Sequence, residues 1–202
     1  MQLTMMLFGL LFLLCSGWAD TNYLVGLAKK WAAAFLLILY ISEMFLPKYE
    51  TENSSVRVLT MLLLLFVTCC SALKITSGWQ RYRCVLCASM FCLVLCFCAL
   101  YFNEYTDRIM TRQTALVAFI ITAFSFIFCS EPMAAFCSTC LCVLGGYSVL
   151  NAVQSALFFS PFQIADAPML LCLFYCWFEL LGLYSFCDIL QARIDARKRV
   201  KP

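Results

Sequence analysis

Histidine is absent from this chain of 202 residues. It is the side chain that most often serves as a general base and as a metal ligand. Its absence argues against a histidine-dependent hydrolase and against most metalloenzymes. The chain also lacks a catalytic triad, an H-E-x-x-H motif and a glycine-rich phosphate loop. We therefore expect a protein that is not an enzyme, with no cofactor and no metal site.

Charge is also scarce: Asp, Glu, Lys and Arg make up 12% of the residues, and apolar residues make up 64%. A water-soluble domain of this size needs more polar surface than this composition supplies. The apolar residues form continuous runs and do not alternate with polar ones, which argues against a transmembrane β-barrel. Hydrocarbon offers the backbone no water to bind, so such runs must form helices. The composition predicts an all-α polytopic integral membrane protein.

Seven apolar segments approach the length that crosses a bilayer, given some help from their flanks. They are residues 3–18, 31–46, 58–73, 84–102, 114–130, 133–159 and 169–190. We expect them to form one transmembrane domain over residues 1–190, or a bundle of six helices if the first segment is a cleaved signal peptide. Aromatic residues such as Trp79, Tyr82 and Tyr101 lie near segment ends, as in the aromatic belts of membrane proteins.

Basic residues divide unequally between the two sides of a bundle of seven helices. Ten fall on one side and four on the other. The ten are Lys29, Lys30, Lys74, Arg81, Arg83, Arg193, Arg197, Lys198, Arg199 and Lys201, and the four are Lys48, Arg57, Arg108 and Arg112. The positive-inside rule then places the C-terminus in the cytoplasm and the N-terminus outside, in the cell's inner membrane. In a competing threading the first segment is cleaved and residues 133–159 form a hairpin at Gly145-Gly146. This threading places nine basic residues on one side and five on the other.

The basic tail, residues 191–202, is expected to continue the last helix along the cytoplasmic membrane surface. Its five basic residues, Arg193, Arg197, Lys198, Arg199 and Lys201, suit contact with anionic lipid headgroups. Docking of a cytoplasmic partner is the alternative. We do not expect nucleic-acid binding from so short a tail.

Segment 133–159 carries small residues at four-residue spacing, which lets helix backbones approach closely in a membrane. They form two series, which are Ala134, Ser138, Cys142 and Gly146, and Ser148, Ala152, Ala156 and Ser160. We interpret this segment as a helix packed against other helices, either within one subunit or at an oligomer contact or pore wall. With 27 residues it must tilt, kink near Gly145-Gly146 or re-enter the membrane.

Glu179 lies near the middle of segment 169–190. A carboxylate at that depth costs a few kcal/mol and should face protein or water. We expect it to face Asn151, Gln154 or a serine of segment 133–159, or to line a polar cavity beside that segment. It then serves either as a proton, cation or gating site, or as a hydrogen-bonded group that fixes the helix register.

The chain has 15 cysteines, nearly all within apolar runs, where free Cys acts as a small hydrophobe. The pair Cys84-Val85-Leu86-Cys87 resembles the redox pair of membrane disulfide-oxidising proteins that use quinone. The resemblance covers these four residues, and the second external pair of that family is missing. A further pair, Cys137 and Cys140, has the same spacing. We favour packing as the role of both pairs.

These features predict a small multi-pass membrane subunit of a larger assembly, of the secretion or conjugation type or a phage-encoded pore or exclusion component. Its partners would be the lipid bilayer and further copies or other membrane subunits. The alternative is a compact ion- or proton-coupled transporter or channel that uses Glu179. A membrane thiol–disulfide oxidoreductase is the remote third possibility.

Overall fold

The computed structural model describes residues 9–12, 34–38, 41, 49–51, 54–56, 58–158, 162–164 and 167–200. Side chains are placed for residues 9–12, 34–38, 41, 60–158 and 168–194. The helices are α3 (Val58–Lys74), α4 (Gly78–Tyr101), α5 (Asn103–Arg112), α6 (Thr114–Phe128), α7 (Pro132–Phe158) and α8 (Ala167–Val200). Three short strands are β1 (Tyr49–Thr51), β2 (Ser54–Val56) and β3 (Phe162–Ile164).

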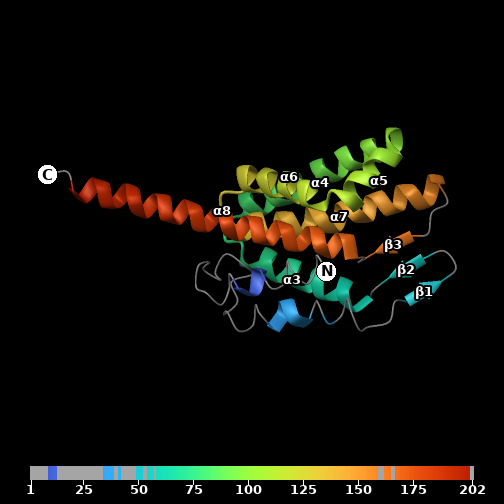
Figure 1. The fold of residues 1–202 in the computed structure, drawn as a ribbon, viewed down its shortest axis with the longest axis horizontal. Helices are drawn as coiled ribbons and strands as arrows, with labels where there is room; N and C mark the ends of the chain where they lie inside the picture. Colours follow the sequence, from blue (N-terminus) through green and yellow to red (C-terminus); the bar gives the residue numbers. More distant parts are fainter. Residues whose placement is uncertain are drawn as a thin grey trace.

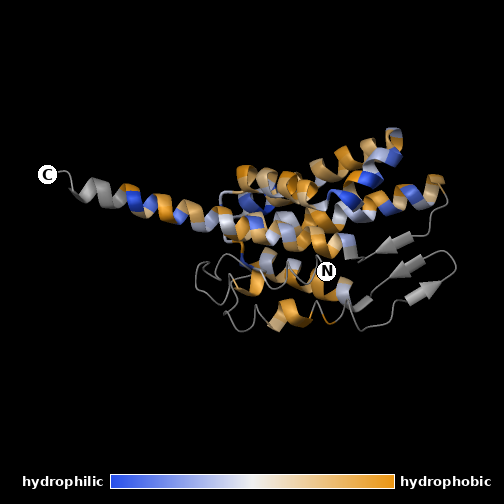
Figure 2. Cartoon of the chain, in the orientation of Figure 1, coloured by the Kyte–Doolittle hydropathy of each residue, from blue (hydrophilic) through white to orange (hydrophobic). Residues whose placement is uncertain are grey.

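The described residues confirm an all-α membrane architecture. Helices α4, α7 and α8 are long and apolar enough to cross a membrane, and a fourth span results if the bent pair α5–α6 counts as one. Helix α3 is a shorter apolar helix. Hydrophobic residues cover most of the bundle, and hydrophilic residues gather on α5 and near the helix ends (Figure 2). The predicted count of seven spans is not confirmed.

The first two predicted segments, 3–18 and 31–46, lie mostly outside the described residues. The parts that are described, residues 9–12 and 34–38, are helical. Leu10 and Leu36 are fully buried, and the ring of Phe35 lies 6.3 Å from that of Trp177 on α8. These two stretches therefore pack against the bundle.

Helix α7 is the central element of the bundle. It contacts α3, α4, α6 and α8, and every side chain from Ala134 to Cys140 is buried. Small side chains dominate this stretch, so neighbouring helices approach closely on several sides. The helix runs without interruption through Gly145 and Gly146 (Figure 1). The hairpin at these glycines in the competing threading is therefore wrong, because the glycines serve close packing and not a turn.

Helix α5 was not expected from the sequence. It is a ten-residue amphipathic helix whose Thr106 and Met110 are buried, and it meets α6 at an angle of 90°. A short helix with charged residues on one face, set across the spans, suits the membrane interface. The apolar pattern was missed because Glu104, Asp107 and Arg108 interrupt it in sequence.

A small three-stranded sheet, with two strands before α3 and one after α7, was also not predicted. Strands β1 and β2 pair antiparallel, with Tyr49 opposite Val56, and β2 pairs with β3 in parallel, with Ser54 opposite Phe162. The sheet lies at the same end of the bundle as α5 (Figure 1). The sheet joins the chain before α3 to the chain before α8.

Helix α8 is 34 residues long, about 51 Å at the usual rise per residue. Its first half packs on α6 and α7, and its second half projects beyond the bundle as a single helix (Figure 1). The expected continuation of the last helix into the basic tail is therefore confirmed as far as Val200.

Candidate functional site

Glu179 lies on α8 and faces Thr122 of α6. Its side chain is half-buried, and its Oε2 atom is buried with no hydrogen-bond partner. The Thr122 hydroxyl is likewise buried with no hydrogen-bond partner. Two polar atoms without hydrogen bonds in an apolar interface are costly to bury. The carboxyl group can take up and release a proton, and the threonine hydroxyl can hydrogen-bond to it in either form.

Aromatic rings pack beside this site. Trp177 is fully buried, and its ring stacks on Phe136 of α7 at 5.3 Å and lies 5.8 Å from Phe174. The bulky rings of α8 pack on α7. Glu179 comes two residues after Trp177, on the opposite side of α8, and therefore faces α6. The rings therefore fill the α7–α8 interface on the other side of α8 from the carboxylate.

The predicted grouping of Glu179 with Asn151 and Gln154 is wrong. Gln154 donates from Nε2 to Asp107 Oδ1 on α5 at 3.2 Å, and Asn151 lies half-buried one turn earlier on α7. Phe136 is the residue of α7 that packs beside Trp177, close to Glu179 along α8. Asn151 lies 15 residues further along α7, which is about 22 Å away. Helices α7 and α8 run antiparallel, so residues close in sequence across the connection lie far from Glu179.

Serine side chains link α6 and α7 at the level of Glu179. Ser125 donates to the hydroxyl of Ser138 at 3.1 Å, and both residues are fully buried. This hydrogen bond satisfies both hydroxyls within the membrane, where water cannot. Ser138 was predicted as a packing residue, and its hydrogen bond was not.

The two cysteines of the first Cys-x-x-Cys pair, on α4, each meet a cysteine of α7, and one of these belongs to the second pair. Cys84 faces Cys137, and Cys87 faces Cys142. All four are buried, and every described cysteine is a free thiol. Sequence spacing alone pairs Cys84 with Cys87, whereas helix packing sets each one opposite a cysteine of another helix.

Glycines of α7 form the closest approach to α4. A Cβ atom on Gly146 would lie 2.8 Å from Leu95 and 2.9 Å from Phe91, and one on Gly145 would lie 2.8 Å from Cys92. The small residues Ala134, Ser138, Cys142 and Gly146 are all buried within this one chain. Ala152 and Ala156 are exposed, so nothing in the described part of the chain covers them.

Basic residues of the predicted membrane surface lie on or beyond the projecting half of α8. Arg193 is exposed. Arg197, Lys198 and Arg199 belong to the helix, with side chains outside the described set, and Lys201 lies outside the described residues. The tail is therefore a helix that carries its charges away from the bundle.

The turns at the opposite end from α5 are held by side-chain hydrogen bonds. Gln80 donates to the Ser130 hydroxyl, and Arg81 donates from Nη2 to the carbonyl of Ile75 at 2.8 Å. Thr76 donates to Glu131 at 3.3 Å. The α3–α4 and α6–α7 connections therefore share one end of the molecule.

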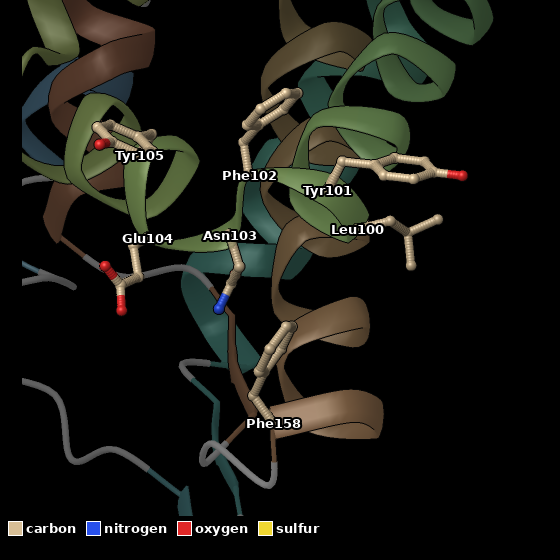
Figure 3. Close-up of a pocket in the computed structure, with 7 residues that line it drawn as sticks. All are labelled: Leu100, Tyr101, Phe102, Asn103, Glu104, Tyr105 and Phe158. Atoms are coloured by element: carbon tan, nitrogen blue, oxygen red, sulfur yellow. The ribbon is translucent and has the colours of Figure 1, made fainter.

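An open pocket of about 430 Å³ lies where α4 passes into α5. Leu100, Tyr101, Phe102, Asn103, Glu104, Tyr105 and Phe158 line it. Figure 3 shows that Tyr101 and Glu104 extend to opposite sides, so these side chains do not converge on one point. The pocket offers no set of polar groups that would orient a small substrate.

Among the described residues, no group of three or more His, Cys, Asp or Glu side chains is placed to hold a metal ion. No protein family model, no curated protein and no solved structure matches this chain. Any functional conclusion therefore depends on the residues and geometry of this chain alone.

Proposed function

We propose that this chain is a non-catalytic membrane subunit of a larger assembly, of the secretion or conjugation type or a phage-encoded pore or exclusion component. The observation that carries the proposal is the projecting half of α8. Phe186, Ile189, Leu190 and Ile194 of this half are all exposed, with Phe186 60% accessible. Their spacing places them on one side of the helix.

The bundle ends well before α8 does. The ring of Phe126, near the end of α6, packs against Tyr184 at 5.2 Å, and α6 ends two residues later. Beyond this level α8 continues for 16 residues, from Ser185 to Val200. The exposed apolar stripe lies within the membrane-spanning stretch Pro168–Ile194, where no other described helix covers it. A helix of a partner subunit can pack against this stripe in place of lipid. This supports a partner at the end of the bundle that carries the tail.

A second contact surface is offered by the far half of α7. Ala152 and Ala156 are exposed and four residues apart, which is the spacing that allows a helix of another subunit to approach closely. A second copy of this chain or a different membrane subunit would fit there. We also propose that the chain lies in the inner membrane of a cell, with the tail of α8 in the cytoplasm.

Purification in mild detergent followed by mass measurement of the intact complex tests the proposal. We expect a mass above that of one chain, and Phe186→Ser combined with Leu190→Ser should remove the partner. Ala192→Ser, an exposed residue on the side of α8 away from Phe186 and Leu190, is the matched control and should retain the partner. A monomer in every preparation, with normal cellular activity, would contradict the proposal.

A second candidate function is proton or cation transfer at Glu179, favoured by its buried oxygen and that of Thr122, neither of which has a hydrogen-bond partner. Purified protein in vesicles should then carry a flux that responds to an ion or pH gradient. Glu179→Gln should abolish that flux, and Glu104→Gln, an exposed carboxylate on α5, should not. Equal flux from empty vesicles and from vesicles that contain the protein would reject this function.

A further inference from the structure

An apolar groove of about 210 Å³ lies where α4, α5 and α6 meet. Its floor is formed by Leu95 of α4, Met110 of α5 and Val117 of α6, all of which are buried. Helix α5 crosses at 90° to α6 and closes the groove at the membrane surface. The groove is therefore closed towards the surface by α5 and open on its side.

The open side of this groove is bordered by exposed apolar residues. Val94 on α4 is 58% accessible, Ile109 on α5 is 40% accessible and Ile120 on α6 is 49% accessible. Residues of this kind on the outside of a membrane bundle face lipid. Lipid chains therefore have direct access to the groove.

The groove suits a hydrocarbon chain better than water or a compact ligand. Thr106 contributes a hydroxyl to the lining, but that hydroxyl already donates to the carbonyl of Phe102 at 3.0 Å. An apolar cavity without free polar groups does not hold ordered water. Its volume is also below the about 300–1,000 Å³ of sites for drug-sized molecules. One acyl chain is the occupant that fits this shape and polarity.

Two arginines of α5 flank the open side. Arg112 follows the rim residue Ile109 by three residues, so the two share a side of the helix, and Arg108 lies one turn before Arg112 on the adjoining exposed side. Both arginines are exposed. Asp107 lies towards α7, where it accepts a hydrogen bond from Gln154 at 3.2 Å. Glu104 is exposed one turn before Arg108, so the exposed side of α5 carries two arginines and one carboxylate and has a net positive charge.

We propose that this groove binds one phospholipid, with an acyl chain between α4 and α6 and the phosphate at Arg108 and Arg112. Arginine matches a phosphate with charge and with paired N–H donors. The acyl chain supplies the apolar surface that the groove lacks. The bound lipid would fix α5 across the ends of α4 and α6.

Photo-cross-linking tests this site in the full chain. The protein is reconstituted in phosphatidylcholine vesicles that contain a phospholipid with a diazirine on one acyl chain. Mass spectrometry should find the cross-links on peptides that contain Val94, Ile109 or Ile120. Cross-linking should fall by about fivefold for each arginine in Arg108→Gln and Arg112→Gln, since a basic residue near headgroups contributes about that factor.

Matched variants on α4 separate filling of the groove from general damage. Val94→Trp fills the groove and should remove the cross-links, whereas Val85→Trp, equally exposed on α4, should retain them. Thermal unfolding in detergent verifies that both variants fold. Unchanged cross-linking in Val94→Trp would overturn the site. Loss in Val94→Trp without loss in the arginine variants, together with equal labelling by a diazirine fatty acid, would overturn the phospholipid assignment.

Discussion

The Ser125–Ser138 hydrogen bond shows how single polar residues fix the packing of α6 on α7. We expect Ser138→Ala to lower the free energy of unfolding by about 1 kcal/mol, because it leaves the buried Ser125 hydroxyl without its partner. Replacing both serines by alanine should cost less than the sum of the two single changes, since no buried hydroxyl remains. Denaturant titration of the three variants in detergent measures the difference. Additive losses would show that the two hydroxyls do not depend on each other.

The cysteines that meet across α4 and α7 are expected to act as packing residues. Changing Cys84 and Cys87 together to alanine should leave function nearly intact and lower stability by no more than a few kcal/mol, as for small core truncations. The physical reason is that each thiol fills a small buried space against a cysteine of α7. Activity and protein level are measured together. Complete loss of activity at a normal protein level would favour the redox alternative.

The sequence predicted that Glu179 contacts protein, but the residues expected to face it were not the ones that do. Its expected partners, Asn151 and Gln154, were chosen because α7 is the nearest polar helix in sequence. The antiparallel pairing of α7 and α8 separates them, and Thr122, a threonine within an apolar run, carried no signal of its own. Pairing of helices depends on tertiary contacts that one sequence does not reveal.

At the scale of elements, close approach of α4 and α7 depends on Gly146. We expect Gly146→Ala to destabilise the protein by about 1–3 kcal/mol, because the added Cβ would lie 2.8 Å from Leu95 and 2.9 Å from Phe91. Gly182→Ala on α8 is the control. A Cβ there meets nothing within 4 Å, so it should stabilise the helix by about 0.5–1 kcal/mol. Melting temperatures in detergent should move in opposite directions, and equal shifts would contradict the close contact.

Long apolar helices were predicted well, and polar or short elements were not. Helix α7 was expected over residues 133–159 and runs from Pro132 to Phe158. Its small residues, up to Gly146, pack within one chain, which is one of the two alternatives left open by the sequence. Helix α5 and the three strands were missed because each has too few apolar residues to give a hydrophobic pattern, and their positions are set by contacts with other segments.

For the whole molecule, exposed aromatic residues on α4 indicate where the membrane surfaces lie. Trp79 and Tyr82 stack at 5.5 Å near the start of α4, and Tyr101 ends the helix. All three are more than half accessible. From Trp79 to Tyr101 the helix rises about 33 Å over 22 residue steps, close to the hydrocarbon thickness of about 30 Å. The expected aromatic belt therefore fits the length of this helix.

The arrangement of the helices also sets which charged residues share a side. The ends of α3 and α6 lie together with the starts of α4 and α7, so Lys74 and Arg81 lie at the end from which the tail of α8 projects. Arg108 and Arg112 on α5 lie at the other end (Figure 1). The positive-inside rule then predicts that the first end faces the cytoplasm.

We expect reporter fusions after Trp79 and Pro202 to be cytoplasmic, and those after Glu50 and Tyr105 to be external. Because one bundle places Trp79 and the tail at the same end, opposite reports from these two fusions would contradict the fold itself. An inverted but consistent pattern would contradict only the orientation.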